Sequence, residues 1–378
     1  MSSGNKKNIS ILTISLASGG AEKVISLLLP ELVKTYNVHL VLFYENIHFP
    51  IPEEVNTVIL HQNQSDDFSK KIFKFPRFIS RYHDFVRKNQ IDASISFLTR
   101  PNFINGFIKM RHPDIKVIIG ERCYPSIAYK SSNLRYWLYK FLIPILYNKA
   151  DIVFSNSKHI NDDLTKSFRV KTNLEILYNP VIMQKRKESF SSNDLKLISV
   201  GSLKPIKNPS MIINAIKNID GISLTFLGDG QLRKSLEQEF ANDSFSKSVS
   251  FEGTVRNVNP YLTQHDCFIL SSNSEGFPNV ILEAMATGLP VISTNCMSGP
   301  LEILNENKKL IIEEGDFVKA KYGLLVNVGD VIGLEKAIRY LLDNPKMLIE
   351  YGKRGYERAR DYTVESIYAE FEKMIEKV

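Results

Sequence analysis

The sequence is poor in cysteine and in long apolar runs, and both shortages restrict what the protein can be. Its 378 residues include three cysteines, Cys123, Cys267 and Cys296, none of them in a CxxC spacing. This predicts reduced thiols in a cytoplasmic protein, with Cys267 a small buried core residue. The purest apolar runs, such as residues 143–146, are far too short to cross a bilayer. The run before Ser18 is short, so no cleaved signal peptide is expected.

Several motifs are also missing. No low-complexity tract and no repeat of fixed period is seen, and there is no DxD pair. The Ser18-Gly19-Gly20 loop is not GxGxxG, and only Glu45 approaches the acidic position that binds a ribose in dinucleotide enzymes. A nicotinamide-dependent enzyme is therefore a poor fit.

Length and charge indicate two different halves. A chain of 378 residues is about twice the usual domain size. Residues 1–184 carry 24 Lys and Arg against 15 Asp and Glu, a net charge of +9, whereas the remainder carries 24 against 26, or −2. A basic half is compatible with nucleic acid, an anionic membrane surface or a phosphorylated substrate.

Strand-like and helix-like segments alternate along both halves. The expected strands are residues 9–16, 39–44, 93–98, 116–120, 151–155, 195–200, 223–227, 248–251, 267–270 and 290–293. Such alternation favours α/β domains with parallel sheets. A turn-rich stretch at 179–194 separates the halves. We therefore expect two Rossmann-like domains facing across a cleft, residues 1–184 and 185–361, and an amphipathic helix at 362–378 that packs back on the N-terminal domain or on the other one.

The segment 274–291 contains the most informative pattern. A helix is expected to begin near Pro278 or Asn279 and to end at Gly288. The N-terminus of a helix exposes N–H groups that suit a diphosphate or a sugar hydroxyl. Between residues 280 and 286 only Glu283 is polar, so its carboxylate is expected to be buried and to need strong donors. Either two ribose hydroxyls or a neighbouring Arg or Lys would supply these donors equally well.

Three further loops follow predicted strands. Glu275 lies eight positions before Glu283, and can point into the cleft or be a solvated loop carboxylate. A glycine after a strand lets the backbone approach a ligand, and ammonium groups can neutralise a diphosphate; solvated basic loops and simple turns are the alternative interpretations. The residues concerned are Gly201, Ser202, Lys204 and Lys207 in one loop, Gly228 and Arg233 in the second, and Gly19 and Gly20 in the third.

Taken together, these segments resemble the retaining glycosyltransferases of family 4, which have the GT-B fold. The matching segments are SGGAEK, YNPV, VGSLxxxKN, GDGxxR, FEG, SEGFPNVILEAMATGLPVIST, SGPLEIL and YGLLV. They cover most of the chain and look most like enzymes that build bacterial cell-surface polysaccharides and lipid-linked glycans. The resemblance implies a nucleotide-sugar donor, a UDP-hexose or UDP-N-acetylhexosamine by preference, with no other cofactor and no metal.

The resemblance also implies individual roles. Glu283 would bind the ribose hydroxyls, Glu275 would face the donor sugar, and Lys207 would neutralise the leaving diphosphate. Donor contacts would also come from the glycine loops and from the backbone of Gly276, Phe277, Pro278 and Asn279. One position departs from the family, which usually has Arg where this chain has Ser202. Lys204 or Arg233 is expected to take over part of that role.

The acceptor is expected on the basic N-terminal half. Arg100, Glu121 and Arg122 follow predicted strand ends, where cleft residues are found, and either bind an acceptor diphosphate or form structural ion pairs. Residues 68–88 and 129–149 interleave basic and aromatic side chains, which suits an anionic membrane surface. We therefore expect a peripheral enzyme at the inner face of the cell membrane, acting on a lipid-linked or lipopolysaccharide-type glycan. A small soluble acceptor is the alternative, and nucleic-acid binding is not expected.

Overall fold

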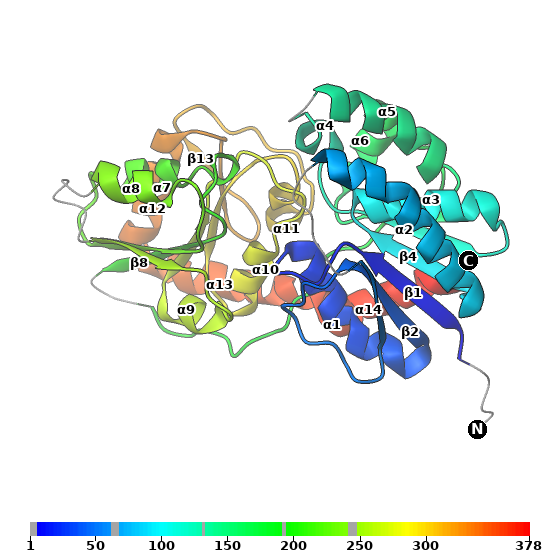
Figure 1. Ribbon diagram of the computed structural model, residues 1–378. Coiled ribbons are helices and arrows are strands. Elements are labelled where there is room, and N and C mark those ends of the chain that lie inside the picture. Colours follow the sequence, from blue (N-terminus) through cyan, green and yellow to red (C-terminus); the bar gives the residue numbers. More distant parts are fainter. Residues whose placement is uncertain (1–5, 62–67, 131–132, 191–193, 241–247) are drawn as a thin grey trace. The chain divides into compact units, whose positions relative to one another are not determined.

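The computed structural model describes residues 6–61, 68–130, 133–190, 194–240 and 248–378. The chain divides into two compact units, residues 1–180 with 364–378 and residues 181–363. Each unit contains a seven-stranded sheet (Figure 1). The predicted α/β class and the GT-B type of architecture, two Rossmann-like sheets of mostly parallel strands, are thereby confirmed.

The first unit has a fully parallel sheet in the order β3-β2-β1-β4-β5-β6-β7. Its strands are β1 (Asn8–Thr13), β2 (Asn37–Tyr44), β3 (Asn56–His61), β4 (Ala93–Phe97), β5 (Lys116–Glu121), β6 (Ile152–Ser155) and β7 (Leu174–Ile176). Its helices are α1 (Gly20–Thr35), α2 (Phe68–Lys88), α3 (Thr99–Arg111), α4 (Pro125–Ala128), α5 (Asn133–Tyr147), α6 (Lys158–Phe168) and α14 (Val364–Glu376). Every residue of β4 is buried, as expected for a central parallel strand covered on both faces.

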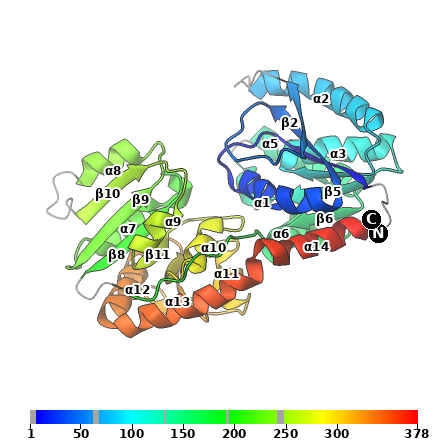
Figure 2. The same ribbon diagram turned by 90° about the horizontal axis from the view of Figure 1, so that it is seen from below.

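The C-terminal helix α14 belongs to the first unit although the second unit precedes it in the chain. It contacts α1, and Figure 2 shows the two helices side by side. The Phe371 ring lies 6.5 Å from that of Phe97 and 6.0 Å from that of Phe154, measured between centroids. This helix therefore completes the core on one face of the first sheet.

The second unit has the sheet order β10-β9-β8-β11-β12-β14-β13, parallel except that β13 is antiparallel to β14. Its strands are β8 (Leu195–Val200), β9 (Ile222–Leu227), β10 (Val249–Gly253), β11 (Cys267–Leu270), β12 (Val291–Thr294), β13 (Phe317–Lys319) and β14 (Leu324–Val326). Its α-helices are α7 (Pro209–Ile216), α8 (Arg233–Phe240), α9 (Asn259–Gln264), α10 (Asn279–Ala286), α11 (Pro300–Asn305), α12 (Val331–Asp343) and α13 (Pro345–Ala359). Two 3₁₀ turns are η1 (Pro205–Lys207) and η3 (Arg360–Tyr362).

The expectations for Cys267 and Gly288 are confirmed, whereas four strands were not predicted. Cys267 is fully buried in the core of the second unit, and Gly288, just past α10, has a positive φ of 79°. Strands β3, β7, β13 and β14 were not predicted from the sequence. β7, β13 and β14 have only three residues each, and β3 is a largely unburied strand at a sheet edge, so none of them shows a clear periodic pattern. No helix within the described part of the chain is both long and apolar enough to cross a membrane.

Candidate functional site

The second unit brings together the two residues predicted to be catalytic. Lys207 ends η1 and Glu275 lies in the loop after β11, and Lys207 Nζ lies 2.5 Å from Glu275 Oε1. Ser272 Oγ donates to the same oxygen at 2.5 Å. The side chains are only partly accessible, 29% for Lys207 and 10% for Glu275. An ammonium group is thus held beside a carboxylate in a recess where solvent screens it incompletely.

Backbone contacts hold both residues in place. Ser271 Oγ donates to the Lys207 carbonyl at 2.8 Å. The Glu275 N–H donates to the Met297 carbonyl at 2.8 Å, and the Ser298 N–H donates to the Glu275 carbonyl at 2.9 Å. Ser272 and Ser298 were not predicted from the sequence. Ser272 stands in the same Ser/Asn-rich loop as Glu275, which was the available signal.

Two glycine turns lie close to the Lys207–Glu275 pair. The Gly201 N–H donates to the Leu227 carbonyl at 2.9 Å, which joins the ends of β8 and β9. Gly228 has φ +133°, and a Cβ there would lie 2.0 Å from the Gly201 carbonyl oxygen. A Cβ on Gly201 itself would meet only Lys207, at 4.0 Å. Gly201, Ser202, Lys207 and Ser272 line a small pocket at this place, so the backbone is open to a ligand here.

The two residues proposed to replace the family arginine differ in their surroundings. Arg233 is the first residue of α8, and its Nε donates to Glu237 at 2.9 Å while Nη2 donates to the Phe251 carbonyl at 2.9 Å. The hydrogen bond with Glu237 is the main cause that raises its pKa. Lys204 is exposed and forms no ion pair with any described residue. Its ammonium group is therefore the more available of the two.

Helix α10 has the features expected from its sequence. It begins at Asn279 after Pro278, which supplies no side-chain cap. Glu283 is buried, with 9% exposure, among the buried apolar residues of the same helix. Phe277 is also buried and its ring lies 5.9 Å from that of Tyr362. Glu283 is thus largely shielded from solvent.

In the first unit, the Gly19-Gly20 turn is occupied by a carboxyl group. Gly19 precedes α1, and a Cβ on it would lie 2.2 Å from Glu22 Oε2. Burial raises the pKa of the Glu22 carboxyl, and the nearby Arg122 guanidinium opposes that shift. Glu22 was not singled out from the sequence, although it stands in the SGGAEK motif.

Glu121, at the end of β5, is almost completely buried. Its Oε2 accepts hydrogen bonds from Tyr147 at 2.8 Å and from Tyr129 at 3.0 Å. Its Oε1 accepts the Arg122 N–H at 3.0 Å and lies 3.3 Å from Cys123 Sγ. Burial is the main cause that raises the pKa of this carboxyl, while these donors oppose the rise. The contact with an acceptor predicted for Glu121 stays a prediction.

Arg122 is also buried, but only part of its guanidinium group forms hydrogen bonds with described residues. Its Nη2 donates to Asn179, and its guanidinium lies 5.6 Å from the centre of the Phe97 ring. Among the described residues, its Nε and Nη1 have no hydrogen-bond partner. Burial lowers the pKa of Arg122 to about 10, against the attraction of Glu121 and Glu22. Buried N–H groups without partners are rare and suit a ligand or water.

Arg100 lies elsewhere on the same unit. It stands in the first turn of α3, and its guanidinium lies 5.9 Å from the centre of the Phe43 ring. The two arginines thus follow neighbouring strands but rest on different aromatic rings. In the described ranges, no group of three His, Cys, Asp or Glu side chains is arranged to hold a metal ion.

Comparisons with known proteins cover both units. Residues 18–185 match the family described as Glycosyltransferase Family 4, and residues 182–358 match the family described as Glycosyl transferases group 1. These two ranges contain nearly all the residues discussed above.

Two relatives from Campylobacter jejuni align over nearly their full length. One is the N-acetylgalactosamine-N,N'-diacetylbacillosaminyl-diphospho-undecaprenol 4-alpha-N-acetylgalactosaminyltransferase, 30% identical over 94% of this chain and 96% of that protein. The other is the GalNAc-alpha-(1->4)-GalNAc-alpha-(1->3)-diNAcBac-PP-undecaprenol alpha-1,4-N-acetyl-D-galactosaminyltransferase, 28% identical over 98% of each.

A solved structure is similar in fold. The Anabaena protein Alr3699/HepE, crystallised in complex with UDP-glucose, superimposes with a TM-score of 0.74. It covers 98% of this chain and 100% of that chain at 15% sequence identity. At this identity the likeness concerns the fold alone.

Proposed function

This chain belongs to the family 4, group 1 glycosyltransferases, and from that premise we propose that it transfers a hexose or N-acetylhexosamine from a UDP-sugar to a lipid-linked or lipopolysaccharide-type glycan. The observation that carries the proposal is the 2.5 Å pair of Lys207 and Glu275 beside an open glycine turn. The two Campylobacter relatives, whose names give undecaprenol-linked acceptors, support the acceptor class.

The second unit supplies the donor site in this proposal. Glu283 binds the ribose hydroxyls, and the backbone of residues 276–279 contacts the sugar and the phosphates at the start of α10. Gly201 and Gly228 give close backbone approach, and Lys204 contributes a second ammonium group near the diphosphate. UDP as the nucleotide is supported by the resemblance of the sequence motifs, and the similarly folded Anabaena protein was crystallised with UDP-glucose.

The reaction proceeds with retention at the anomeric carbon. The acceptor hydroxyl oxygen forms the new bond to that carbon on the face from which UDP leaves. The bond between the anomeric carbon and the phosphate oxygen breaks, and the leaving phosphate oxygen takes the acceptor proton. Lys207 neutralises the growing charge on the diphosphate, which is where a preorganised cation stabilises the transition state. Glu275 orients Lys207 and faces the sugar.

The first unit supplies the acceptor site. Arg122 offers its Nε and Nη1, which bond to no described residue, to an acceptor phosphate. Gly19 and Gly20, just before and at the start of α1, are instead proposed contacts of the donor. Arg100 adds a second positive charge, and Glu121 positions Arg122 through its backbone N–H. No cofactor besides the nucleotide sugar takes part in this scheme, and no nucleic acid is a partner.

The acceptor class also indicates where the enzyme works. A polyprenyl-linked glycan is anchored in a bilayer, and the first unit carries the excess of basic residues. We therefore place the enzyme peripherally on the inner, anionic face of the cell membrane. Transfer to a free oligosaccharide with the same efficiency as to a lipid-linked one would favour the soluble alternative.

Thermal stabilisation by a panel of UDP-, GDP-, ADP- and CDP-sugars tests the donor site. A ligand that binds only the folded protein raises the melting temperature, so UDP-sugars are expected to give the largest shift. Glu283→Ala should abolish that shift, and Lys204→Ala should weaken it. If no nucleotide sugar stabilises the wild-type protein at saturation, the proposed donor site is wrong; an unchanged shift in Lys204→Ala removes that residue alone from the scheme.

A further inference from the structure

One face of α5 exposes a continuous row of large apolar side chains. Its members are Leu134, Trp137, Leu138, Phe141 and Ile145, exposed by 76%, 64%, 40%, 65% and 39% respectively. Their spacing of three and four residues places them along one side of the helix. The opposite side of α5 is buried in the core of the first unit, through Ile143, Leu146 and Tyr147. An exposed apolar row of this length on a folded helix indicates a binding surface.

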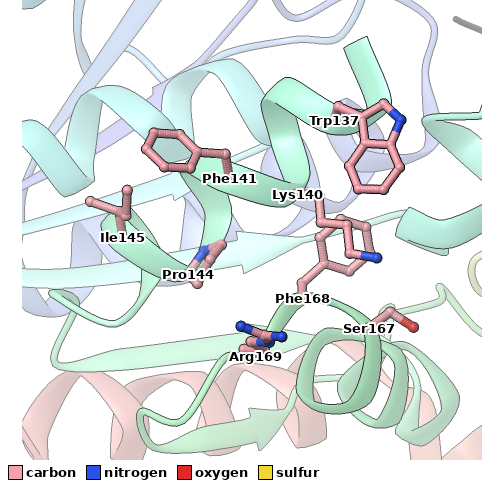
Figure 3. A pocket seen from close by; sticks show the side chains of 8 residues that line it. All are labelled: Trp137, Lys140, Phe141, Pro144, Ile145, Ser167, Phe168 and Arg169. Carbon is pink, nitrogen blue, oxygen red and sulfur yellow. The ribbon is translucent and has the colours of Figure 1, made fainter. Parts of the chain in front are cut away.

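A pocket opens beside this row. Figure 3 shows Trp137, Phe141 and Ile145 on α5 above the end of α6, with the pocket between the two helices. Pro144 and Phe168 contribute further apolar surface. The surface that lines the pocket is therefore mostly hydrocarbon, which suits an alkyl or prenyl chain.

The charges around the pocket are positive. Lys140 and Arg169 are among the residues that line it. The Lys140 ammonium lies 5.2 Å from the centre of the Trp137 ring. Between Glu121 and Asp151 the sequence contains five Lys or Arg and no acidic residue. The nearest acidic residues on α6 are Asp163, which is buried and accepts hydrogen bonds from the Ser126 N–H at 2.8 Å and from Ser126 Oγ at 2.5 Å, and Asp162, which is 4.0 Å from Lys166. Helices that lie in the headgroup region of a bilayer typically have a row of exposed apolar side chains flanked by aromatic and positively charged residues.

We propose that the exposed face of α5 docks on an anionic lipid bilayer and that the pocket between α5 and α6 takes one hydrocarbon chain of a membrane lipid. Trp137 and Phe141 enter the acyl boundary, while Lys140 and Arg169 contact phosphate headgroups. This inference rests on the proposed function for its lipid-linked acceptor, and it assigns the membrane contact to one helix. Residues 68–88, the other basic segment, are less informative because the side chains of 68–74 lie outside the described part of the structure.

The single tryptophan of the chain makes the proposal directly measurable. The full-length protein is mixed with vesicles of phosphatidylglycerol and phosphatidylcholine, and the Trp137 emission is recorded. Insertion should shift the emission to shorter wavelength, and lipids with brominated acyl chains should quench it. Vesicles of phosphatidylcholine alone should bind more weakly, and salt should release part of the protein.

Variants test the surface without removing the reporter. Leu134→Ser combined with Phe141→Ser should weaken vesicle binding about tenfold or more, because two large apolar groups no longer enter the bilayer. Arg169→Glu should reduce the preference for phosphatidylglycerol. Ile311→Ser is the matched control, since Ile311 is 83% exposed in the second unit. Circular dichroism shows whether each variant is folded.

Several outcomes would overturn the proposal. Sedimentation with vesicles without a change in Trp137 emission would place the membrane contact elsewhere. A dimer in solution that dissociates in the Leu134→Ser/Phe141→Ser variant would show that a second copy covers this face. Failure of this inference is separable from failure of the proposed function, because transfer to a detergent-solubilised acceptor needs no bilayer. The double variant should keep that activity and lose activity on acceptor embedded in vesicles.

Discussion

At the scale of single residues, the functional assignment depends on a few charged side chains that are partly or fully buried. Lys207 and Glu275 share a recess, and two buried nitrogens of Arg122, Nε and Nη1, form no hydrogen bond with any described residue. Charged groups in such places interact more strongly with a ligand than the same groups in water. Their burial, rather than their residue type, separates them from the many exposed lysines and glutamates of the chain.

Replacing Lys207 tests the residue with the clearest chemical role. Lys207→Ala should lower kcat by about a hundredfold to a thousandfold, because the leaving diphosphate loses a preorganised cation. Single-turnover transfer of a radiolabelled sugar measures the chemical step. Lys353→Ala, an exposed lysine on α13, is the control. A normal rate in Lys207→Ala would remove Lys207 from the catalytic machinery.

At the scale of elements, the proposed donor site lies where strands end and helices begin. The turn after β8 and the turn after β9 touch through Gly201 and Gly228. Helix α10 brings Glu283 inside the fold, and its apolar sequence requires that burial. Parallel strands end at one edge of a sheet, so loops distant in sequence meet there.

Two glycines with positive φ allow the cost of a steric clash to be measured separately from the cost of backbone strain. Gly228→Ala places its Cβ against the Gly201 carbonyl, whereas Gly329→Ala, at φ +77°, meets no atom within 4 Å. We expect Gly329→Ala to cost about 1 to 2 kcal/mol for its backbone conformation alone. Gly228→Ala should cost about 1 to 3 kcal/mol more and should weaken UDP binding. Urea unfolding and UDP titration measure these effects, and equal costs for both variants would contradict the close contact.

At the scale of the whole molecule, the chain forms two units and returns to the first with its last helix. Each unit has its own buried core. The return is fixed by α14, whose apolar side includes Ile367, Phe371, Met374 and Ile375, all buried. Residues 364–378 thus stabilise the unit that begins the chain.

Phe371→Ala tests this connection. The change should destabilise the first unit by about 3 to 5 kcal/mol, because a large side chain leaves a packed core. Hydrogen exchange should increase in β4 and β6 and stay unchanged in β11 and β12, which belong to the second unit. Ile349→Ala, an exposed residue of α13, is the control. Equal acceleration in both units would contradict the assignment of α14 to the first.

Several features were determined by the sequence itself. The alternation of apolar and polar segments was enough to predict two α/β units, because periodicity records which faces are buried. The apolar run around Glu283 predicted a buried carboxylate, and the glycines at 201 and 228 predicted tight turns after strands. Each of these rests on interactions between near neighbours in the chain.

Other features were decided only by the tertiary structure. The sequence did not show that Lys207 and Glu275 would lie 2.5 Å apart, or that Glu121 would accept hydrogen bonds from two tyrosines. It also placed Trp137 in a basic aromatic segment without showing which side of that helix is exposed. The Lys207–Glu275 and Glu121–Tyr147 contacts join residues 68 and 26 positions apart in the chain. Only the packing of helices against the sheets determines which of these side chains meet and which face of a helix remains open.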